Sequence, residues 1–242
     1  MPELSEEQPN NLETVLGAYL LHIEELRKRL MLVLLIFIAT SVASFWIAQL
    51  LIQVLTVPIG GLGHLQSIEV TENISVYMKV SILSGFILAL PFITYELLAF
   101  IMPGLLPKEK RWIYWIIPMA TLLFLSGVAF AYFVMLPVAI PFLIGFLGIQ
   151  TTPRLANYFS FVTNLLFWMG AIFEMPLVIF VLAKLKIVNV GMLAKQWRLA
   201  VVISAVVAAV ITPTVDPINM GLVMVPLLVL YLLSLLFALL AR

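Results

Sequence analysis

The chain has 242 residues, of which 64% are hydrophobic and only 10% are charged, and its mean hydropathy is +1.17. A soluble domain is nearer half apolar and a quarter charged, so the composition predicts an integral membrane protein. The net charge of +1 excludes a strongly basic nucleic-acid-binding protein, and the absence of cysteine excludes disulfides, thiol catalysis and thiolate metal sites.

The N-terminal part combines a polar tail with the first apolar segment. Residues 1–13 are polar and acidic and are expected to form a disordered cytoplasmic tail. A short helix is expected over 14–29, followed by a first membrane span over 30–51. No short apolar segment with a small-residue cleavage site precedes this span, so no cleaved signal peptide is expected.

Further apolar segments follow, separated by polar or proline- and glycine-rich connections. Spans are expected at 75–101, 112–136, 157–183, 199–211 and 220–240, with a longer loop over 137–156 that begins at Pro137. Crossing the hydrocarbon core takes about 20 apolar residues, so the fifth segment is expected to be short. The predicted fold is all-α, with six transmembrane helices in one domain over 14–242.

Lysine and arginine occur in alternate connections, which predicts the orientation. They occupy the N-terminal segment (Arg27, Lys28, Arg29), the second connection (Lys108, Lys110, Arg111), the fourth (Lys184, Lys186, Lys195, Arg198) and the C-terminus (Arg242). The other connections contain only Arg154. Because basic loops stay inside, both termini are expected to be cytoplasmic. Lys79 lies inside a span and is expected to snorkel outward, with Glu72 as a candidate partner.

Glu174 is an acidic residue inside the fourth span, two positions before Pro176. A carboxylate at membrane depth is costly and is usually functional, whereas proline is expected to kink the helix. In a functional interpretation Glu174 contacts substrate or a partner helix, or takes up a proton. In the alternative it is a protonated side chain satisfied by a neighbouring helix.

Two acids lie among bases at the expected cytoplasmic surface, Glu25 before the first span and Glu109 in the second connection. The simple interpretations are helical pairing of Glu25 with Arg29 and a solvated connector around Glu109. Two carboxylates at one membrane level also suit a pair of guanidinium groups. Glu96 is expected to snorkel, and Asp216 to have a turn role.

Catalysis is not expected, because the only histidines, His22 and His64, lie apart and outside the spans. There is no nucleophile elbow, metalloprotease motif or phosphate-binding loop. No cofactor or metal site is predicted. A secondary transporter that uses Glu174 is an alternative, but the internal repeats typical of transporters are missing.

The chain resembles the TatC family, the multispanning subunit of the twin-arginine protein translocase. The matching blocks are HIEELRKRL at 22–30, VPI around Pro58, the Thr71-Glu72 turn leading to Lys79, LPFITYELLAFIMPGL at 90–105 followed by KEKR, GVAFAYFVMLP at 127–137, YFSFV at 158–162, FEMP at 173–176 and ITPTVDP at 211–217. The family commonly has a Ser/Thr-Gln pair after Asp216, where this chain has Asn219-Met220.

The resemblance implies a curved, glove-like and concave arrangement whose fifth and sixth helices are short. It implies a receptor in the cell membrane that binds twin-arginine signal peptides of folded proteins and initiates export driven by the proton-motive force. The implied partners are TatA- and TatB-type single-span subunits, those signal peptides, further copies of the chain and membrane lipid, with no nucleic acid. The implied site residues are Glu25, Glu109, Arg27, Leu30 and Phe100 for the signal peptide, Glu174 and Tyr132 within the membrane, and Pro58, Glu72, Lys79 and Asp216 on the opposite side.

Overall fold

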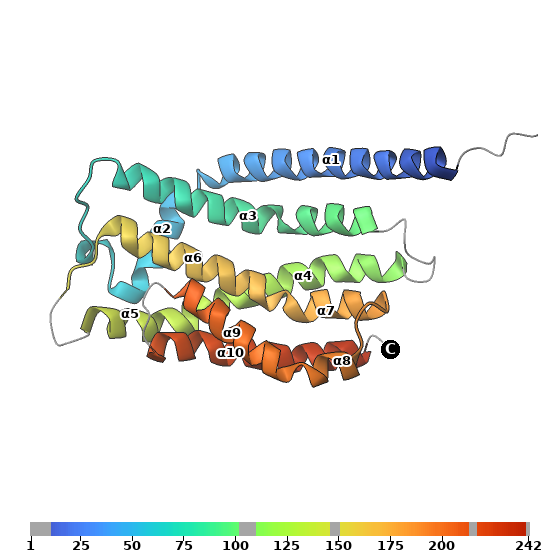
Figure 1. The fold of residues 1–242 in the computed structure, drawn as a ribbon. Coiled ribbons are helices and arrows are strands. Elements are labelled where there is room, and N and C mark those ends of the chain that lie inside the picture. The colour runs from blue at the N-terminus through green and yellow to red at the C-terminus, as the bar shows by residue number, and fades with distance from the viewer. Residues whose placement is uncertain (1–10, 102–109, 146–150, 213–216, 241–242) are drawn as a thin grey trace, which may run out of the picture.

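The computed structural model describes residues 11–101, 110–145, 151–212 and 217–240, which are helical almost throughout (Figure 1). This confirms the all-α prediction. The helices are α1 (Asn11–Ser44), α2 (Ala48–Thr56), η1 (Val57–Ile59), η2 (Leu62–His64), α3 (Glu72–Ile101), α4 (Lys110–Phe130), the π-helical turn η4 (Ala131–Met135), α5 (Leu136–Gly145), α6 (Leu155–Phe173), α7 (Met175–Lys184), α8 (Val190–Lys195), α9 (Trp197–Ile211) and α10 (Pro217–Leu240).

Within these described residues, four helical stretches are long and apolar enough to cross a membrane: Glu72–Ile101, Tyr114–Gly145, Leu155–Lys184 and Met220–Leu240. The segments His22–Ser44 and Ala48–Ile59 pass the same test as a pair bent by 73°. Helix α9 has 15 residues, which confirms the short fifth segment. The expectation of a short sixth helix was wrong, because the 21 residues of its apolar stretch extend for about 30 Å.

Helix α1 is one continuous helix of 34 residues rather than a short helix followed by a separate span. It begins at Asn11, so the expected tail overlaps its first turn, and residues 1–10 lie outside the described residues. The first span was expected to continue to residue 51, but α1 ends at Ser44 and the chain turns. Helix α2 crosses the end of the bundle (Figure 1), which buries Ala48 and Leu55 in the core.

The span predicted at 112–136 is longer than expected, because Pro137 does not begin a loop. The helix continues through η4 and α5 to Gly145. A proline inside a helix removes one backbone hydrogen bond and crowds the preceding turn. Here the wider π-helical turn immediately precedes the proline, and such a turn lets the helix continue around the missing donor.

Helix α3 packs against α1, α4 and α6, while α10 packs against α7 and α9. Helices α4 and α6 approach closely at two glycines. A Cβ atom added at Gly127 would lie 2.6 Å from the carbonyl oxygen of Met169, and one at Gly170 would lie 2.6 Å from the ring of Phe124. Small residues permit such backbone approach between membrane helices. This crossing fixes the position of α6 just before Glu174.

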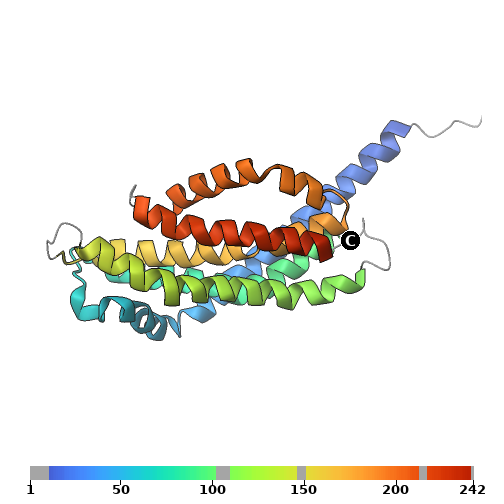
Figure 2. The ribbon, with the colours of Figure 1, turned by 90° about the horizontal axis from the view of Figure 1, so that it is seen from below.

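The two ends of the bundle differ in composition. The start of α1, the ends of α3 and α7, helix α8 and the C-terminal end of α10 lie together at one end (Figures 1 and 2). We call this the basic end, because α1, α7 and α8 carry lysine and arginine there. Helix α2, residues 57–71 and the start of α6 lie at the opposite end, which we call the loop end.

Candidate functional site

At the basic end, Arg29 joins two carboxylates that come from different helices. Its Nε and Nη2 atoms donate to Oε1 of Glu25, one turn earlier on α1, at 3.1 and 2.7 Å. Its Nη1 atom donates to Oε2 of Glu96 on α3 at 2.9 Å. The pairing of Glu25 with Arg29 is confirmed. The expectation that Glu96 snorkels was wrong, because its side chain is only 12% exposed and binds across to α1.

We call Glu25, Arg29 and Glu96 the basic-end cluster. Within the described part of the chain, Oε2 of Glu25 accepts no hydrogen bond and lies 3.9 Å from Nδ1 of His22. The ring of His22 stacks on Phe100 with centroids 4.4 Å apart. Oε2 of Glu25 is therefore open to a further donor.

The other residues predicted at this end have different positions. Arg27 is exposed on α1, and Leu30 is 65% exposed. The structure thus brings Glu25 and Phe100 together through His22. Glu109 lies outside the described residues. Sequence reasoning missed the roles of Arg29 and Glu96, which are 67 positions apart, because the contact depends on how α1 and α3 face each other.

At the loop end, Arg154, the residue before α6, forms ion pairs with two acidic side chains. Its Nε atom donates to Oε1 of Glu72, a carboxylate that is 2% exposed, and its Nη2 atom pairs with Glu69 at 2.6 Å. The hydrogen bonds to Glu72 and then Glu69 raise the pKa of the Arg154 guanidinium. Gln66 pairs with Arg154 through the backbone, so this arginine ties residues 66–72 to α6.

The suggested pairing of Lys79 with Glu72 was wrong. Glu72 is taken by Arg154, whereas Lys79 lies about two turns further along α3 and donates to Oγ of Ser160 on α6. Pro58 lies in η1, and the hydroxyl of Tyr132 donates to the carbonyl of Val54 at 2.8 Å, which ties η4 to α2. Asp216 lies outside the described residues.

Glu174 lies at the break between α6 and α7, with Pro176 in the first turn of α7. The helix is interrupted here, two residues before Pro176, where a kink was expected. Within the described residues the Oε1 atom of Glu174 is buried and has no hydrogen-bond partner. Among the described residues, no neighbouring helix therefore provides a hydrogen bond to this oxygen. This differs from the alternative in which a neighbouring helix satisfies a protonated Glu174.

Glu174 lines a cavity of about 290 Å³ between α3, α4 and α7, which we call the Glu174 groove. Apart from Glu174 and Thr94, all of its lining side chains are apolar. The groove extends along α3 and α7 to Ile101 and Leu185, towards the basic end. The groove therefore contains one carboxylate, and its apolar lining extends to the same end of the bundle as the basic-end cluster.

In the described part of the chain, no group of three or more histidine, cysteine, aspartate or glutamate side chains could hold a metal ion.

The amino-acid sequence that carries these features matches a known family. A sequence model described as "Sec-independent protein translocase protein (TatC)" matches residues 21–226. The chain belongs to the TatC family. The TatC protein of Deinococcus radiodurans is 39% identical over 219 residues, covering 87% of this chain and 81% of that protein. The TatC protein of Aquifex aeolicus is 36% identical, with 87% and 90% covered.

Two solved structures agree with this assignment. A crystal structure titled as the twin-arginine translocase receptor TatC matches with a TM-score of 0.78 and 35% identity, covering 91% of this chain and 99% of that one. A second, of TatC in the detergent DDM, has a TM-score of 0.81 and 34% identity, covering 89% and 98%. The chain is thus a multispanning subunit of a protein-transport system, and it is not an enzyme.

Proposed function

We propose that this TatC-family chain is the receptor that binds twin-arginine signal peptides of folded proteins and initiates their export, driven by the proton-motive force. The observation that carries the proposal is the basic-end cluster. Glu25 already accepts two guanidinium N–H groups through Oε1, and its Oε2 atom is open. Carboxylate and guanidinium groups form strong, directional hydrogen bonds, so the position that suits Arg29 also suits a signal arginine.

The second signal arginine is assigned to Glu109, on the connection between α3 and α4. Arg27, Leu30 and Phe100 border the site. Leu30 is exposed and can contact apolar side chains of the peptide, while Phe100 supports His22 beside Glu25. The two carboxylates divide the recognition of consecutive arginines between α1 and this connection.

The apolar segment of the signal peptide is assigned to the Glu174 groove. The groove offers a nearly continuous apolar lining that starts at the basic end, which suits a hydrophobic peptide entering from there. The carboxyl group of Glu174 is a polar group in this otherwise largely apolar lining. An unpartnered carboxylate at membrane depth is costly, and a polar group of the bound segment would reduce that cost.

The proposed membrane arrangement has six crossings with both termini in the cytoplasm, in a concave arrangement within the cell membrane. The bent pair at the N-terminus and the short α9 supply the two crossings beyond the four full-length stretches. The basic residues at one end of the bundle support a cytoplasmic location for that end. TatA- and TatB-type single-span subunits and further copies of the chain are the proposed partners. Pro58 and Asp216 are assigned to the non-cytoplasmic side, and Tyr132 to a position within the membrane.

The test is photo-crosslinking of a twin-arginine signal peptide to the membrane-embedded full chain. We expect the double variant Glu25→Ala, Glu109→Ala to lose most of the crosslinked product, and a peptide with two lysines to crosslink weakly to the unmodified chain. Glu24→Ala is the matched control, because Glu24 lies next to Glu25 but pairs with Lys28 at 2.9 Å on the exposed face. Undiminished crosslinking in the double variant would overturn the assignment.

A further inference from the structure

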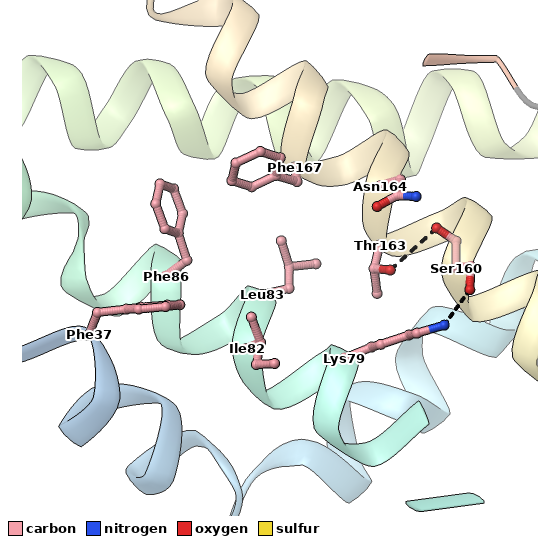
Figure 3. Close-up of a pocket in the computed structure, with 9 residues that line it drawn as sticks. All are labelled: Phe37, Lys79, Ile82, Leu83, Phe86, Ser160, Thr163, Asn164 and Phe167. Atoms are coloured by element: carbon pink, nitrogen blue, oxygen red, sulfur yellow. Dashed lines mark hydrogen bonds between the residues drawn. The ribbon is translucent and has the colours of Figure 1, made fainter. Parts of the chain in front are cut away.

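A second cavity, of about 450 Å³, lies between α1, α3 and α6 (Figure 3). Its polar end carries Lys79, Ser160 and Asn164, and its apolar end carries Phe37, Phe86 and Phe167. We call it the Lys79 cavity. It shares only helix α3 with the Glu174 groove and lies nearer the loop end. Its volume falls within the range of small-molecule sites, roughly 300–1,000 Å³.

The ammonium group of Lys79 has no counter-ion in the described part of the chain. One of its N–H groups donates to Oγ of Ser160, and no described carboxylate lies within 4.0 Å of it. The nearest acid along α3, Glu72, is held by Arg154. The amide of Asn164 is exposed and makes no hydrogen bond with the described residues. The polar end therefore presents one uncompensated positive charge and an amide free to bind a ligand.

The depth of this charge follows from helix geometry. The 30 residues of α3 extend for about 45 Å, close to the thickness of a bilayer with its headgroups. Lys79 lies seven residues from the first residue of α3, or about 10 Å, which places it near the boundary between headgroups and hydrocarbon. Phe86 lies about 10 Å deeper. The cavity thus changes from polar to apolar in the direction in which a phospholipid does.

We propose that the Lys79 cavity binds an anionic phospholipid of the leaflet at the loop end. The headgroup phosphate accepts hydrogen bonds from Lys79 and Asn164, and an acyl chain lies along Phe37, Phe86 and Phe167. The charge selects this occupant, because a lone ammonium at this depth is costly and an anionic headgroup is the counter-ion that the membrane supplies. The same charge disfavours the arginine-rich part of a signal peptide.

A lipid bound here would also connect helices that otherwise make little contact. Helix α3 is the main packing partner of α1 among the described elements, whereas Phe37 of α1 and Phe167 of α6 face the same cavity. An acyl chain between them joins α1 to α6. Loss of the lipid is therefore expected to loosen α1 first.

The experiment is native mass spectrometry of the purified full chain, titrated with phosphatidylglycerol and separately with phosphatidylcholine. We expect the unmodified chain to retain phosphatidylglycerol about tenfold better, since hydrogen bonds to charged groups contribute on that scale. Lys79→Gln and Asn164→Asp should both lose the preference, the second because its carboxylate pairs with Lys79 in place of the lipid. Lys79→Arg should keep it.

Lys195→Gln is the matched control, because it removes one exposed lysine from α8 and leaves the cavity unchanged. Thermal unfolding without added lipid checks that each variant is folded. The proposal is overturned if Lys79→Gln or Asn164→Asp retains phosphatidylglycerol as well as the control does. It is also overturned if a photo-crosslinker placed at Phe167 captures a signal peptide rather than lipid.

Discussion

Replacing Arg29 with glutamine should tighten the binding of a twin-arginine signal peptide. In the proposed receptor, Arg29 occupies the carboxylate that the peptide needs, so a signal arginine must share Glu25 with it. The variant removes the guanidinium that binds both Glu25 and Glu96. The cluster then changes from one net negative charge to two, and the attraction for an incoming cation increases.

The size of the effect follows from how exposed these ion pairs are. The side chain of Arg29 is 26% exposed and that of Glu25 is 36% exposed, so the pair that a signal arginine must displace is worth nearer the surface value of about 0.2–1 kcal/mol than the value of a buried pair. The upper end of this range, about 1 kcal/mol, corresponds to about fivefold in a dissociation constant.

The assay is fluorescence anisotropy of a labelled twin-arginine peptide on the chain reconstituted in nanodiscs. Lys28→Gln is the matched control, because it removes one cation from the same helical turn but breaks only the exposed pair with Glu24. We expect a lower dissociation constant for Arg29→Gln than for Lys28→Gln. Equal values, or weaker binding by Arg29→Gln, would show that Arg29 does not compete with the signal arginines.

Three further substitutions test the rest of the structure. Glu174→Leu should raise the free energy of unfolding by about 1 kcal/mol, because the variant removes a buried oxygen that has no hydrogen-bond partner. The same variant should lower export in a signal-dependent transport assay. Gly127→Ala should lower the unfolding free energy by about 1–3 kcal/mol, since its Cβ would lie 2.6 Å from a carbonyl oxygen of α6, whereas Gly221→Ala, with open space around it, should be neutral. Tyr132→Phe should cost about 1 kcal/mol in a denaturant titration, through the lost hydrogen bond to α2, while Tyr114→Phe, at a position 74% exposed, should cost nothing measurable.

The sequence predicted the features that depend on local spacing. The pair of Glu25 and Arg29 follows from four-residue spacing on a helix, and the break at Glu174 follows from Pro176. The expectation of a short last helix came from the family resemblance and was wrong, because the apolar run of residues 220–240 forms one full-length helical stretch.

Features that depend on helix rotation could not be predicted in the same way. The contact of Arg29 with Glu96 and the close approach at Gly127 require the relative rotation and depth of neighbouring helices. The effect of a proline on a helix is also difficult to predict from the sequence. Pro176 follows a break, whereas Pro137 follows a π-helical turn that lets the helix continue, and the sequence around the two prolines does not distinguish these outcomes.

The polar groups of the bundle fall into two kinds. Near its ends, Arg29 and Arg154 bind carboxylates of the same chain, as a stable fold requires. Within the spans, Lys79 lacks a counter-ion and Glu174 has an oxygen without a partner in the described residues. Folding alone would favour apolar side chains at both positions, because a lysine without a counter-ion and a buried polar oxygen without a partner are both costly within a membrane. Each lines a cavity with an otherwise largely apolar surface, so both positions are better explained by ligands that complete them than by the stability of the fold.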